Sequence, residues 1–570
     1  MAIKSFKFEG DFETTVDPCD VRVWASCLVD IDSFDTSFIG NDIESMFEFL
    51  KNKNSTVYFH NLKFDGEFIL SYLLTNGYKY SDKAENKTFK TLITDDGLFY
   101  SITVIFEVKN KKYKKVTFYD SLKKLPFKVS VISKAFELAD EKLEIDYKAH
   151  REKGHALTEE EKQYIINDCR IVAQALHIQF EKGLTKMTNA SDAMNNYKEL
   201  IGKNRFEQWF PVLPHSLDAD IRRAYKGGFT YLNPKYKNKR VKGGKVYDVN
   251  SLYPWAMYNC VLPYGYPMYF EGEYVPNENY PLYICKIQCN FKLKKDHIPT
   301  IQIKSGFRFN PTEYLESSNR EIVEMVLTSV DLQLLLDHYE IKYIKYINGY
   351  MFKSASGMFK TYIDYWMNIK ETTTGANRQL AKLMLNSLYG RFATNPKAFT
   401  KIPYLEDGVV RYEVIDTVDK AKKYGVKPPE LRDPVYTAMA CFITAYAREK
   451  TIRSAQEVYD RYIYADTDSL HVEGFETPDN LDVHPTKLGC WKDEGTFIDS
   501  YYIRAKTYME TMLNEDGTTE TKVTCAGMPD NVKEQVTYDN FKSGSTFDGK
   551  LMPKRYKGGV VLVETTFTIK

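Results

Sequence analysis

Two aspartates separated by a single residue, Asp466 and Asp468, stand in the run YADTDS. If Tyr462–Ala465 and Leu470–Val472 pair as a hairpin, both carboxylates lie in its tight turn. Like charges a few ångströms apart raise each other's pKa, and a bound divalent cation removes that conflict. The pair therefore predicts a metal site, although an ordinary Asx turn is the alternative for an isolated Asp-x-Asp.

A third carboxylate, Asp248, lies near the end of a short strand predicted over Val246–Val249. Facing the hairpin, it would complete a centre of two ions about 3.5–4 Å apart, which activates a 3′-hydroxyl and stabilises leaving pyrophosphate. The backbone carbonyl of Val249 is a further candidate ligand. Tyr253, beside Pro254, is expected to lie under an incoming sugar and to crowd a 2′-hydroxyl. The pattern predicts nucleotidyl transfer.

A helix predicted around the run KLMLNSLYG supplies groups for a nucleoside triphosphate. The residues that share one face at 100° per residue are Arg378, Lys382, Asn386 and Tyr389. Lys382 is expected to grip triphosphate oxygens, and Tyr389 to stack on the nascent base pair. Lys370 is a second phosphate candidate. Ser251 and Leu252, next to Tyr253, complete the predicted nucleotide-binding set.

A second group of acids lies in the first third of the chain. Asp11 and Glu13 alternate along a predicted strand that begins at Lys4, so they share a face. Tyr164 and Asp168 share a face of a helix predicted over 159–180. The complete set is Asp11, Glu13, Asp65, Lys142, Tyr164 and Asp168. Such a set predicts two-metal hydrolysis of a phosphodiester, with the tyrosine orienting water and the lysine assisting at the phosphate. Scattered surface acids are the alternative.

Aromatic and basic side chains near these groups predict contacts with DNA. Phe64, Phe68, Ser121 and Leu122 are expected to hold a frayed single strand. Lys506 and Tyr508, in the run KTY, are expected to hold the primer end from one side of a strand.

Composition restricts the class of protein. With 570 residues and 43% hydrophobic content, the chain can bury several cores. The net charge is +1, but no acid separates Asp220 from Asp248, where nine Lys and Arg occur, and the segment 471–500 is acidic. This segregation predicts a positive channel. Nine scattered Cys without zinc spacing, and no apolar run near ~18 residues, predict an intracellular protein without a membrane segment.

The positioning elements follow from periodicity and breakers. Strand and helix patterns alternate in the first third, which predicts an α/β domain. We expect an inserted α/β unit over 269–350, a helical region over 357–389 with a turn near Gly375, a loop-rich insertion over 397–434 and a helix over 435–459. The run VLPYGYP is expected to stop regular structure.

Taken together, these motifs resemble the protein-primed family B DNA polymerases of small Bacillus bacteriophages, the phi-twenty-nine-like group, along almost the whole chain. The motifs are DFETT, YFHNLKFDG, DSLKKLPF, the YxxxD at Tyr164, YKGGFT, DVNSLYP, KLMLNSLYG, YADTDS, KTY and GGVVLVETTFTIK.

The resemblance implies an α/β and α+β multidomain fold, with an N-terminal ribonuclease H-like 3′-5′ exonuclease domain and a right-hand polymerase domain that carries two family-specific insertions. The expected boundaries are 1–188 for the exonuclease domain, 189–260 and 434–525 for the palm, 261–357 for insertion 1, 358–395 for the fingers, 396–433 for insertion 2 and 526–570 for the thumb.

The same resemblance implies a DNA-directed DNA polymerase that replicates a linear phage genome by protein-primed, strand-displacing, processive synthesis with proofreading. It implies two Mg²⁺ (or Mn²⁺) ions per centre. The implied partners are primer-template and single-stranded DNA, dNTPs and a terminal protein, bound by a monomer or in a heterodimer with the terminal protein. The implied location is the cytoplasm of an infected bacterial host.

Carried over residue by residue, Asp248 and Asp468 match the principal polymerase metal ligands, with Asp466 beside them. Tyr225, Gly227 and Gly228 match a YxGG element between domains. The residues that match single-strand or terminal-protein contacts are Thr14, His60, Asn61, Phe64, Ser121 and Leu122. Glu144 is the nearest fit to an additional exonuclease acid that binds metal, with Asp146 as competitor.

Two departures from the family pattern stand out. Ala465 replaces a frequent glycine, and the long run containing GVKPPE leaves the displacement geometry of insertion 2 open. A replication-initiation scaffold that binds terminal protein and DNA without catalysis is one alternative function. A nuclease whose polymerase half is structural is the other.

Overall fold

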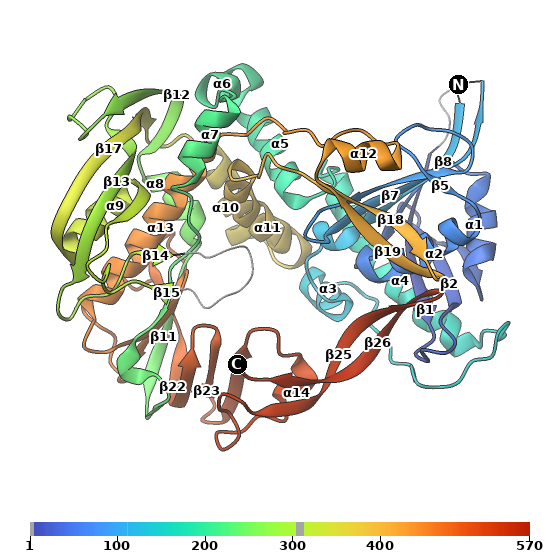
Figure 1. Ribbon diagram of the computed structural model, residues 1–570. Helices are drawn as coiled ribbons and strands as arrows, with labels where there is room; N and C mark the ends of the chain where they lie inside the picture. The colour runs from blue at the N-terminus through green and yellow to red at the C-terminus, as the bar shows by residue number, and fades with distance from the viewer. Residues whose placement is uncertain (1–4, 111, 304–312) are drawn as a thin grey trace.

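The strand and helix patterns of the first third build one large mixed sheet. The computed structural model describes residues 5–110, 112–303 and 313–570, with this sheet at one end of the molecule (Figure 1). Its order is β3-β2-β1-β4-β8-β7-β6-β5, with β1 antiparallel to β2 and parallel to β4. The strands are β1 (Phe6–Thr14), β2 (Val23–Asp30), β3 (Thr36–Gly40), β4 (Ser55–Phe59), β5 (Lys79–Tyr80), β6 (Thr88–Ile93), β7 (Phe99–Lys109) and β8 (Lys112–Asp120). Lys4, where the first strand was expected to begin, lies outside the described residues.

Helices cover this sheet and bring acids to it. They are α1 (Ile43–Lys51), α2 (Leu62–Thr75), α3 (Val129–Phe136) and α4 (Glu159–Glu181). The start of α4 is set by a capping box, in which the Thr158 hydroxyl accepts from the Glu161 N–H and the Glu161 carboxylate accepts from the Thr158 N–H. Because α4 packs against β1 and β2, its inward residues Tyr164 and Asp168 are buried beside the β1 acids.

A second large sheet forms the centre of the other lobe. Its order is β24-β23-β22-β11-β21-β20-β9, with β10 also beside β22. The strands are β9 (Thr230–Leu232), β10 (Arg240–Val241), β11 (Gly244–Val249), β20 (Tyr462–Asp466), β21 (Ser469–Glu473), β22 (Trp491–Arg504), β23 (Thr507–Leu513) and β24 (Thr519–Cys525). The small residues of α13 (Thr437–Glu457) let it pack closely against β20, β21 and several helices, so it is buried along most of its length.

Three cations of the basic run after Asp220 pair with the acidic segment in this sheet. Because β10 and β11 both pair with β22, they bring these cations against the acidic segment. The resulting ion pairs are Arg240–Asp499 at 2.6 Å, Lys242–Asp499 at 2.6 Å and Lys245–Asp493 at 2.5 Å. At these three residues, charges that are separated along the chain are therefore paired in space, and the positive channel stays a prediction.

The first inserted unit is a four-stranded sheet of order β12-β17-β13-β16 with one helix. Its elements are β12 (Leu262–Glu271), β13 (Leu282–Leu293), β16 (Val323–Thr328), α9 (Ser329–His338) and β17 (Tyr339–Ala355), with the short pair β14 (Gln302–Ile303) and β15 (Glu313–Tyr314). The prediction that VLPYGYP stops regular structure was wrong, since β12 runs through it. As an edge strand with an irregularity between Tyr264 and Met268, β12 accommodates Pro263 and Pro267.

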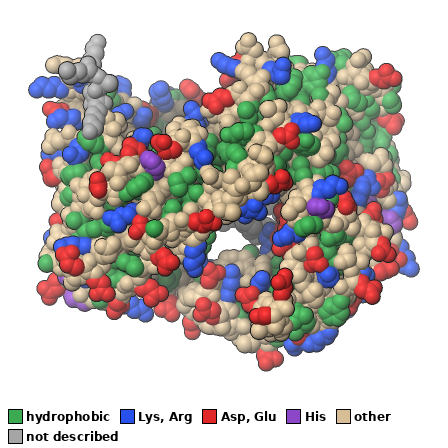
Figure 2. Space-filling view, turned by 180° about the vertical axis from the view of Figure 1, so that it is seen from behind, with side chains coloured by type: hydrophobic (Ala, Val, Ile, Leu, Met, Phe, Trp, Pro, Cys, Tyr) green, Lys and Arg blue, Asp and Glu red, His purple; other side chains and the backbone are tan. Residues whose placement is uncertain are grey.

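The second insertion was expected to be loop-rich, but it contains a hairpin, β18 (Thr400–Glu406) and β19 (Val409–Ile415), followed by α12 (Val418–Tyr424). Its Thr400 bridges to Thr94 of the first sheet. The C-terminal hairpin, β25 (Thr546–Tyr556) and β26 (Gly559–Thr568), crosses from the second sheet to the first lobe (Figure 1), where Arg555 Nε donates to Glu67 Oε1 at 2.7 Å. A hollow opens near the centre of the face shown in Figure 2.

The remaining helices fill the space between the sheets. They are α5 (Asn189–Ile201), α6 (Lys203–Trp209), α7 (His215–Arg222), α8 (Leu252–Asn259), α10 (Lys360–Thr372), α11 (Gly375–Phe392) and α14 (Asp530–Lys533). The predicted turn near Gly375 separates α10 from α11. Within the described ranges, no helix combines the length and apolar character that crossing a membrane requires.

Candidate functional site

The predicted hairpin of YADTDS is present as β20 and β21, with a very tight turn at Thr467. The turn requires a left-handed backbone at Thr467, where φ is 63°, and the Asp468 N–H donates to the Asp466 carbonyl at 2.8 Å. The neighbouring strand fixes the turn, because the Val249 N–H donates to the Asp468 carbonyl at 2.8 Å. The backbone around the acids is therefore held from two sides.

Strand register brings the three predicted acids together. Asp248 lies opposite Ser469 on β21, and Ser469 lies opposite Asp466 on β20, so Asp248 and Asp466 share one face, and Asp468 in the turn is close enough for its charge to act on Asp248. We call Asp248, Asp466 and Asp468 the hairpin cluster. Burial raises the pKa of Asp248 to about 7, with a further contribution from the charge of Asp468. Burial also raises the pKa of Asp468.

Asp466 differs from its two neighbours because the chain already supplies its hydrogen bonds. Its Oδ1 accepts from Thr230 Oγ1 at 2.8 Å, and its Oδ2 accepts from Tyr464 Oη at 3.2 Å. Lys506 Nζ lies 2.8 and 2.7 Å from the two carboxylate oxygens. Lys506 was predicted on a strand with Tyr508, but it lies in the turn before β23 with φ of 58°. From there it reaches the acids across the sheet.

The predicted nucleotide-binding residues converge next to the hairpin cluster. The rings of Tyr253 and Tyr389 stack with centroids 3.9 Å apart. Lys370 Nζ donates to Ser251 Oγ at 2.9 Å, and Arg378 Nη1 donates to the Lys370 carbonyl at 2.5 Å. Burial lowers the pKa of Lys370, and the charges of Arg378 and of Lys382 lower it further. Three cations held this close predict an anion site. Leu252 is buried, whereas Asn386 is exposed.

The YKGG run, Tyr225 to Gly228, packs against both parts of this site. A Cβ on Gly228 would lie 2.4 Å from Thr467 Oγ1 and 2.7 Å from its Cγ2, so a glycine is needed for the loop to approach the turn. Burial raises the pKa of Tyr225, and Tyr389 adds to the shift, which places the two phenols near each other. Gly227 lies in the chain between Tyr225 and Gly228, the residues that make these two contacts.

The predicted acids of the first third also come together. Asp11 and Glu13 lie on one face of β1, Asp65 lies in the first turn of α2, and Asp168 reaches them from α4. We call Asp11, Glu13, Asp65 and Asp168 the amino-terminal cluster. Burial raises the pKa of Asp11 to about 7, and the charge of Asp168 adds to it. Burial, with the neighbouring acids, also raises the pKa of Glu13 and of Asp65.

Lys142 is the cation of the amino-terminal cluster. It pairs with Asp168 Oδ2 and donates to Tyr164 Oη at 3.1 Å, while the Tyr164 hydroxyl also meets that of Tyr147. Burial acts to lower the pKa of Lys142, but the pair with Asp168 outweighs it and raises the pKa. Burial raises the pKa of Asp168 even against this lysine. Lysine, tyrosine and acid thus form the arrangement that the sequence predicted.

His60 and Ser121 form a buried link beside this cluster. His60 Nε2 donates to the Phe127 carbonyl at 2.7 Å, and Nδ1 lies 3.0 Å from Ser121 Oγ. Burial lowers the pKa of His60, which favours the neutral ring that accepts from Ser121. The backbone N–H groups of Asn61 and Leu122 both donate to Asp120 Oδ1, at 3.1 Å each, so Asp120 fixes both loops.

The other predicted DNA contacts are unequally accessible. Thr14 and Phe64 are partly exposed. Phe68 is 2% exposed, and the backbone of Gly559 covers its ring, because a Cβ there would lie 2.4 Å from it. Its predicted stacking role stays a prediction. Glu144 and Asp146 are both exposed, so the choice between them stays open.

Two carboxyl groups near the amino-terminal cluster were not predicted. Glu9 lies one alternation before Asp11 on β1, is 1% exposed, and its Oε2 has no hydrogen-bond partner among the described residues. Burial raises its pKa, and the charges of Asp11 and Asp65 raise it further. Asp120 is the other group. The sequence offered a signal for Glu9 alone, which is its period-2 spacing with Asp11 and Glu13 along the predicted strand.

The donor chemistry of both clusters fits divalent cations. In the part of the chain that the structure describes, no three His, Cys, Asp or Glu side chains are grouped as a ready-made metal site. Asp168 Oδ1 is nevertheless buried without a hydrogen-bond partner, and mutual repulsion between the acids contributes to their raised pKa values. Hard cations with oxygen ligands relieve both features.

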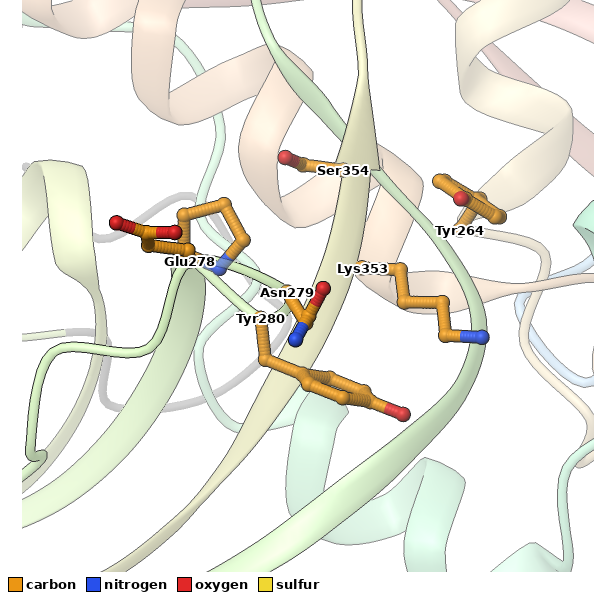
Figure 3. A pocket seen from close by; sticks show the side chains of 7 residues that line it. Tyr264, Glu278, Asn279, Tyr280, Lys353 and Ser354 are labelled. Atoms are coloured by element: carbon orange, nitrogen blue, oxygen red, sulfur yellow. The ribbon is translucent and has the colours of Figure 1, made fainter.

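A shallow pocket of about 560 Å³ lies in the inserted sheet (Figure 3). Tyr264 and Lys353 lie on opposite strands there, and Lys353 Nζ lies 6.0 Å from the centroid of the Tyr280 ring. None of the predicted catalytic residues lines it.

Comparison with known proteins gives matches over nearly the whole chain. The family described as DNA polymerase type B, organellar and viral, matches residues 47–157 and 145–485. The DNA polymerase of Bacillus phage B103 is 46% identical over 579 residues, covering 99% of each chain. That of Bacillus phage phi29 is 45% identical over 578 residues with the same coverage.

Solved structures agree with these sequence matches. The phi29 DNA polymerase complexed with primer-template DNA has a TM-score of 0.94 at 44% identity, covering 100% of both chains. Complexes of the same protein with single-stranded DNA, and with primer-template DNA and incoming nucleotide substrates, have TM-scores of 0.93 at 44% identity, covering 99% of this chain and 100% of theirs. The predicted α/β and α+β multidomain fold class is confirmed by these matches.

Proposed function

The chain belongs to the organellar and viral type B DNA polymerases, and we propose that it extends a DNA primer at the hairpin cluster and trims 3′ ends at the amino-terminal cluster. The observation that carries this proposal is that two separate acid clusters lie on two different sheets, each with one lysine paired to one acid. Two centres of this kind support synthesis and proofreading by one chain.

Extension would depend on the hairpin cluster and the cations of α10 and α11. Lys370 and Lys382 would hold the triphosphate, while the stacked rings of Tyr253 and Tyr389 would bear on the sugar and the nascent base pair. Lys506, in the turn before β23, and Tyr508, in β23, would hold the primer end beside Asp466. The acids and the triphosphate site come from different elements, so the primer end and the nucleotide can be held independently.

Trimming would depend on the amino-terminal cluster and its tyrosine. Tyr164 Oη, held by Lys142 and Tyr147, would orient the attacking water, while Lys142 stabilises the phosphate charge. The residues proposed to contact the single strand are Thr14, His60, Asn61, Phe64, Phe68, Ser121 and Leu122. The buried contact between His60 and Ser121 would hold the loops that carry these two residues in a fixed relative position.

Divalent cations complete both centres in this proposal. The residues that would hold them are Asp248, Val249 through its carbonyl, Asp466 and Asp468 in one centre, and Asp11, Glu13, Asp65, Asp168 and Glu144 in the other. Bound there, Mg²⁺ or Mn²⁺ supplies Lewis-acid stabilisation of phosphoryl charge and lowers the pKa of a bound hydroxyl or water. Asp248 and Asp468 are the principal ligands, because Asp466 already accepts from three donors.

The proposed partners follow from the family and from the phi29 complexes with primer-template DNA, single-stranded DNA and nucleotides. A terminal protein would supply the priming hydroxyl, and synthesis would displace the non-template strand processively along a linear phage genome. The chain would act as a monomer, or in a heterodimer with the terminal protein, in the cytoplasm of the infected bacterium.

Two single substitutions test the separation of the centres. Asp468→Ala should abolish primer extension with Mg²⁺ and labelled nucleotides while single-strand digestion continues. Asp11→Ala should abolish digestion while extension continues. Loss of both activities in either variant, with an unchanged melting temperature, would show that the two-centre assignment is wrong.

Copying a singly primed circle beyond one turn tests strand displacement, which is excluded if synthesis stops after one turn.

A further inference from the structure

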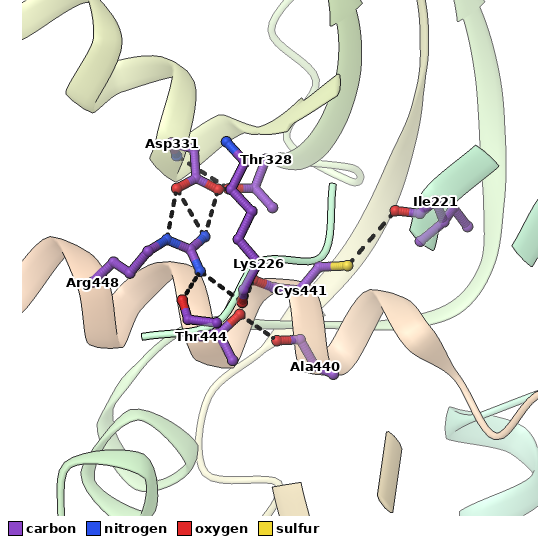
Figure 4. A network of polar contacts seen from close by, with 9 residues as sticks. Ile221, Lys226, Thr328, Asp331, Ala440, Cys441, Thr444 and Arg448 are labelled. Carbon is purple, nitrogen blue, oxygen red and sulfur yellow. Dashed lines mark hydrogen bonds and ion pairs between the residues drawn. The ribbon is translucent and has the colours of Figure 1, made fainter. Parts of the chain in front are cut away.

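The side chain of Arg448, on α13, is buried where three separate parts of the chain meet (Figure 4). Its Nη1 donates to the backbone carbonyls of Lys226 and Gly227 at 2.9 and 2.8 Å. Its Nη2 donates to both carboxylate oxygens of Asp331 at 2.8 Å, and its Nε donates to Oδ1 at 3.2 Å. Arg448 therefore ties α13 to the YKGG run and to α9 of the inserted sheet.

Asp331 is held in a fixed orientation. Its N–H donates to Thr328 Oγ1 at 3.1 Å, and this hydroxyl lies 2.9 Å from Asp331 Oδ2 at the start of α9. Asp331 and Arg448 are 5% and 4% exposed, so water does not replace either partner. An arginine suits this position because its planar fork reaches a carboxylate and two carbonyls in fixed directions.

The segment that Arg448 holds supports the turn of the hairpin cluster. The Thr467 N–H donates to the carbonyl of Phe229, directly after the YKGG run, at 2.6 Å, and Gly228 backs onto the Thr467 side chain. Thr451, three residues after Arg448 on the same helix, donates to the Thr467 carbonyl at 2.6 Å. Neighbouring residues of one helix face thus fix both sides of the peptide unit at the turn.

We propose that Arg448 is a positioning residue of the polymerase reaction, which sets the turn carrying Asp468 through the YKGG run, and that Asp331 couples this setting to the docking of the inserted sheet. This inference rests on the proposed assignment of the polymerase centre to the hairpin cluster. Arg448 acts through backbone carbonyls rather than on a reacting atom. A displacement of α9 would therefore change the extension rate without touching the acids.

The chain offers a matched control on the same two helices. Arg453 of α13 pairs with Asp337 of α9 at 3.0 Å, and its Nε donates to Glu449 at 2.9 Å. This pair joins the same elements with the same chemistry, but it is part-exposed, and its hydrogen bonds go to Asp337 and Glu449 rather than to the carbonyls that Arg448 holds. A general effect of loosening α13 from α9 would appear in both pairs.

The first test is single-nucleotide insertion kinetics with primer-template DNA. In Arg448→Lys the charge remains, but one ammonium group cannot span the carboxylate and both carbonyls. We expect kcat to fall about tenfold or more while KM for the nucleotide stays within about twofold. Single-strand digestion should be unchanged, and Arg453→Lys should resemble wild type in every measurement. Unchanged kcat in Arg448→Lys, or an equal loss in Arg453→Lys, overturns the proposal.

A second variant guards against unfolding caused by a buried ion pair whose hydrogen bonds the lysine does not all satisfy. Arg448→Met with Asp331→Leu removes both charges, and such paired apolar replacements are tolerated in protein interiors. We expect a folded protein with normal digestion and the same loss of kcat. Wild-type extension by this double variant also overturns the proposal.

The outcomes separate this inference from the proposed function. If Asp468→Ala still extends primers, the assignment of the polymerase centre fails. If Asp468→Ala is inactive in extension but both Arg448 variants extend normally, only the positioning role fails.

Discussion

The four acids of the amino-terminal cluster and the neighbouring Glu9 make five carboxyl groups gathered near the cation of Lys142, while in the hairpin cluster three aspartates lie near Lys506. The five groups are Glu9, Asp11, Glu13, Asp65 and Asp168. All five have a raised pKa. In the hairpin cluster the cation and two hydroxyls are concentrated on Asp466, which leaves Asp248 and Asp468 with raised pKa values.

This difference separates two ways of preparing acids for phosphoryl transfer. In the amino-terminal cluster, the acids come from one strand and two helices, so burial dominates, and the pair with Lys142 lowers the pKa of Asp168 against that burial. In the hairpin cluster, the backbone of one turn sets the geometry. Its cation, Lys506, pairs with Asp466 rather than with the principal acids Asp248 and Asp468. We therefore expect the amino-terminal cluster to depend more on its lysine, and the hairpin cluster to depend more on backbone fit.

The largest effect should distinguish the acids within the hairpin cluster. Asp248→Asn should lower the extension rate about a thousandfold, on the order of 4 kcal/mol, because it removes a principal ligand. Asp466→Asn should lower it only about tenfold, because the amide oxygen can still accept from Thr230 and no principal metal ligand is removed. Primer extension measures both, and digestion is the internal control. Equal losses would show that all three aspartates are equivalent.

The lysines provide the next contrast. Lys142→Met should lower digestion about a hundredfold, because Asp168 loses its cation in a buried site. Lys506→Met should lower extension about tenfold, since Asp466 keeps two hydroxyl donors. Both rates are compared with those of wild type at the same Mg²⁺ concentration. A larger loss in Lys506→Met than in Lys142→Met would reverse the proposed difference between the clusters.

The acids were predictable because their signals are local. Asp466 and Asp468 lie two residues apart between apolar runs, and Asp11 and Glu13 follow a strand period, so short-range geometry brings each pair together. Strand register then brings Asp248 to the hairpin, which sequence spacing alone could suggest but not determine. The left-handed turn at Lys506 has no glycine or asparagine to mark it, so that residue was assigned to a strand.

What could not be predicted depends on contacts between distant segments. Arg448 and Asp331 are 117 positions apart and occur in ordinary charged helices, so nothing local marks them as a buried pair. Glu9 resembles the polar side of an exposed strand, but α4 and its neighbours cover that face. The acidic partners of Arg240, Lys242 and Lys245 could not be predicted for the same reason, because they lie on β22.

Backbone fit can be tested with one glycine in each region. Gly228→Ala should lower extension about fivefold, because the new Cβ would overlap the Thr467 side chain at the turn. Gly10→Ala should lower digestion less, because its Cβ would meet the ends of Leu28, Phe59 and Val57 at 3.0 Å. The rates of primer extension and of single-strand digestion are measured for both variants and compared with those of wild type. A greater effect of Gly10→Ala would contradict the idea that backbone fit matters more in the hairpin cluster.

The smallest effect concerns the buried ion pairs that support the two regions. Burial acts to raise the pKa of Asp331, but Arg448 outweighs it and holds the pKa below its usual value. For Asp192, which pairs with the buried Lys124, burial prevails and the pKa is raised. A carboxyl with a depressed pKa stabilises the folded state above its unfolded pKa, about 3.9, and this contribution is lost as pH falls through the folded pKa. A raised pKa has the opposite sign, since the folded state then binds its proton at higher pH than the unfolded chain.

The two pairs should therefore respond oppositely to acid. The difference in melting temperature between wild type and Asp331→Asn should be largest near neutral pH and shrink at pH values below about 4. The difference between wild type and Asp192→Asn should instead grow as the pH falls from neutral towards about 4. Calorimetry of each variant at matched pH values measures both trends. Parallel trends would mean that arginine and lysine hold their buried partners in the same ionisation state, and the contrast between the regions would then be confined to the acid clusters themselves.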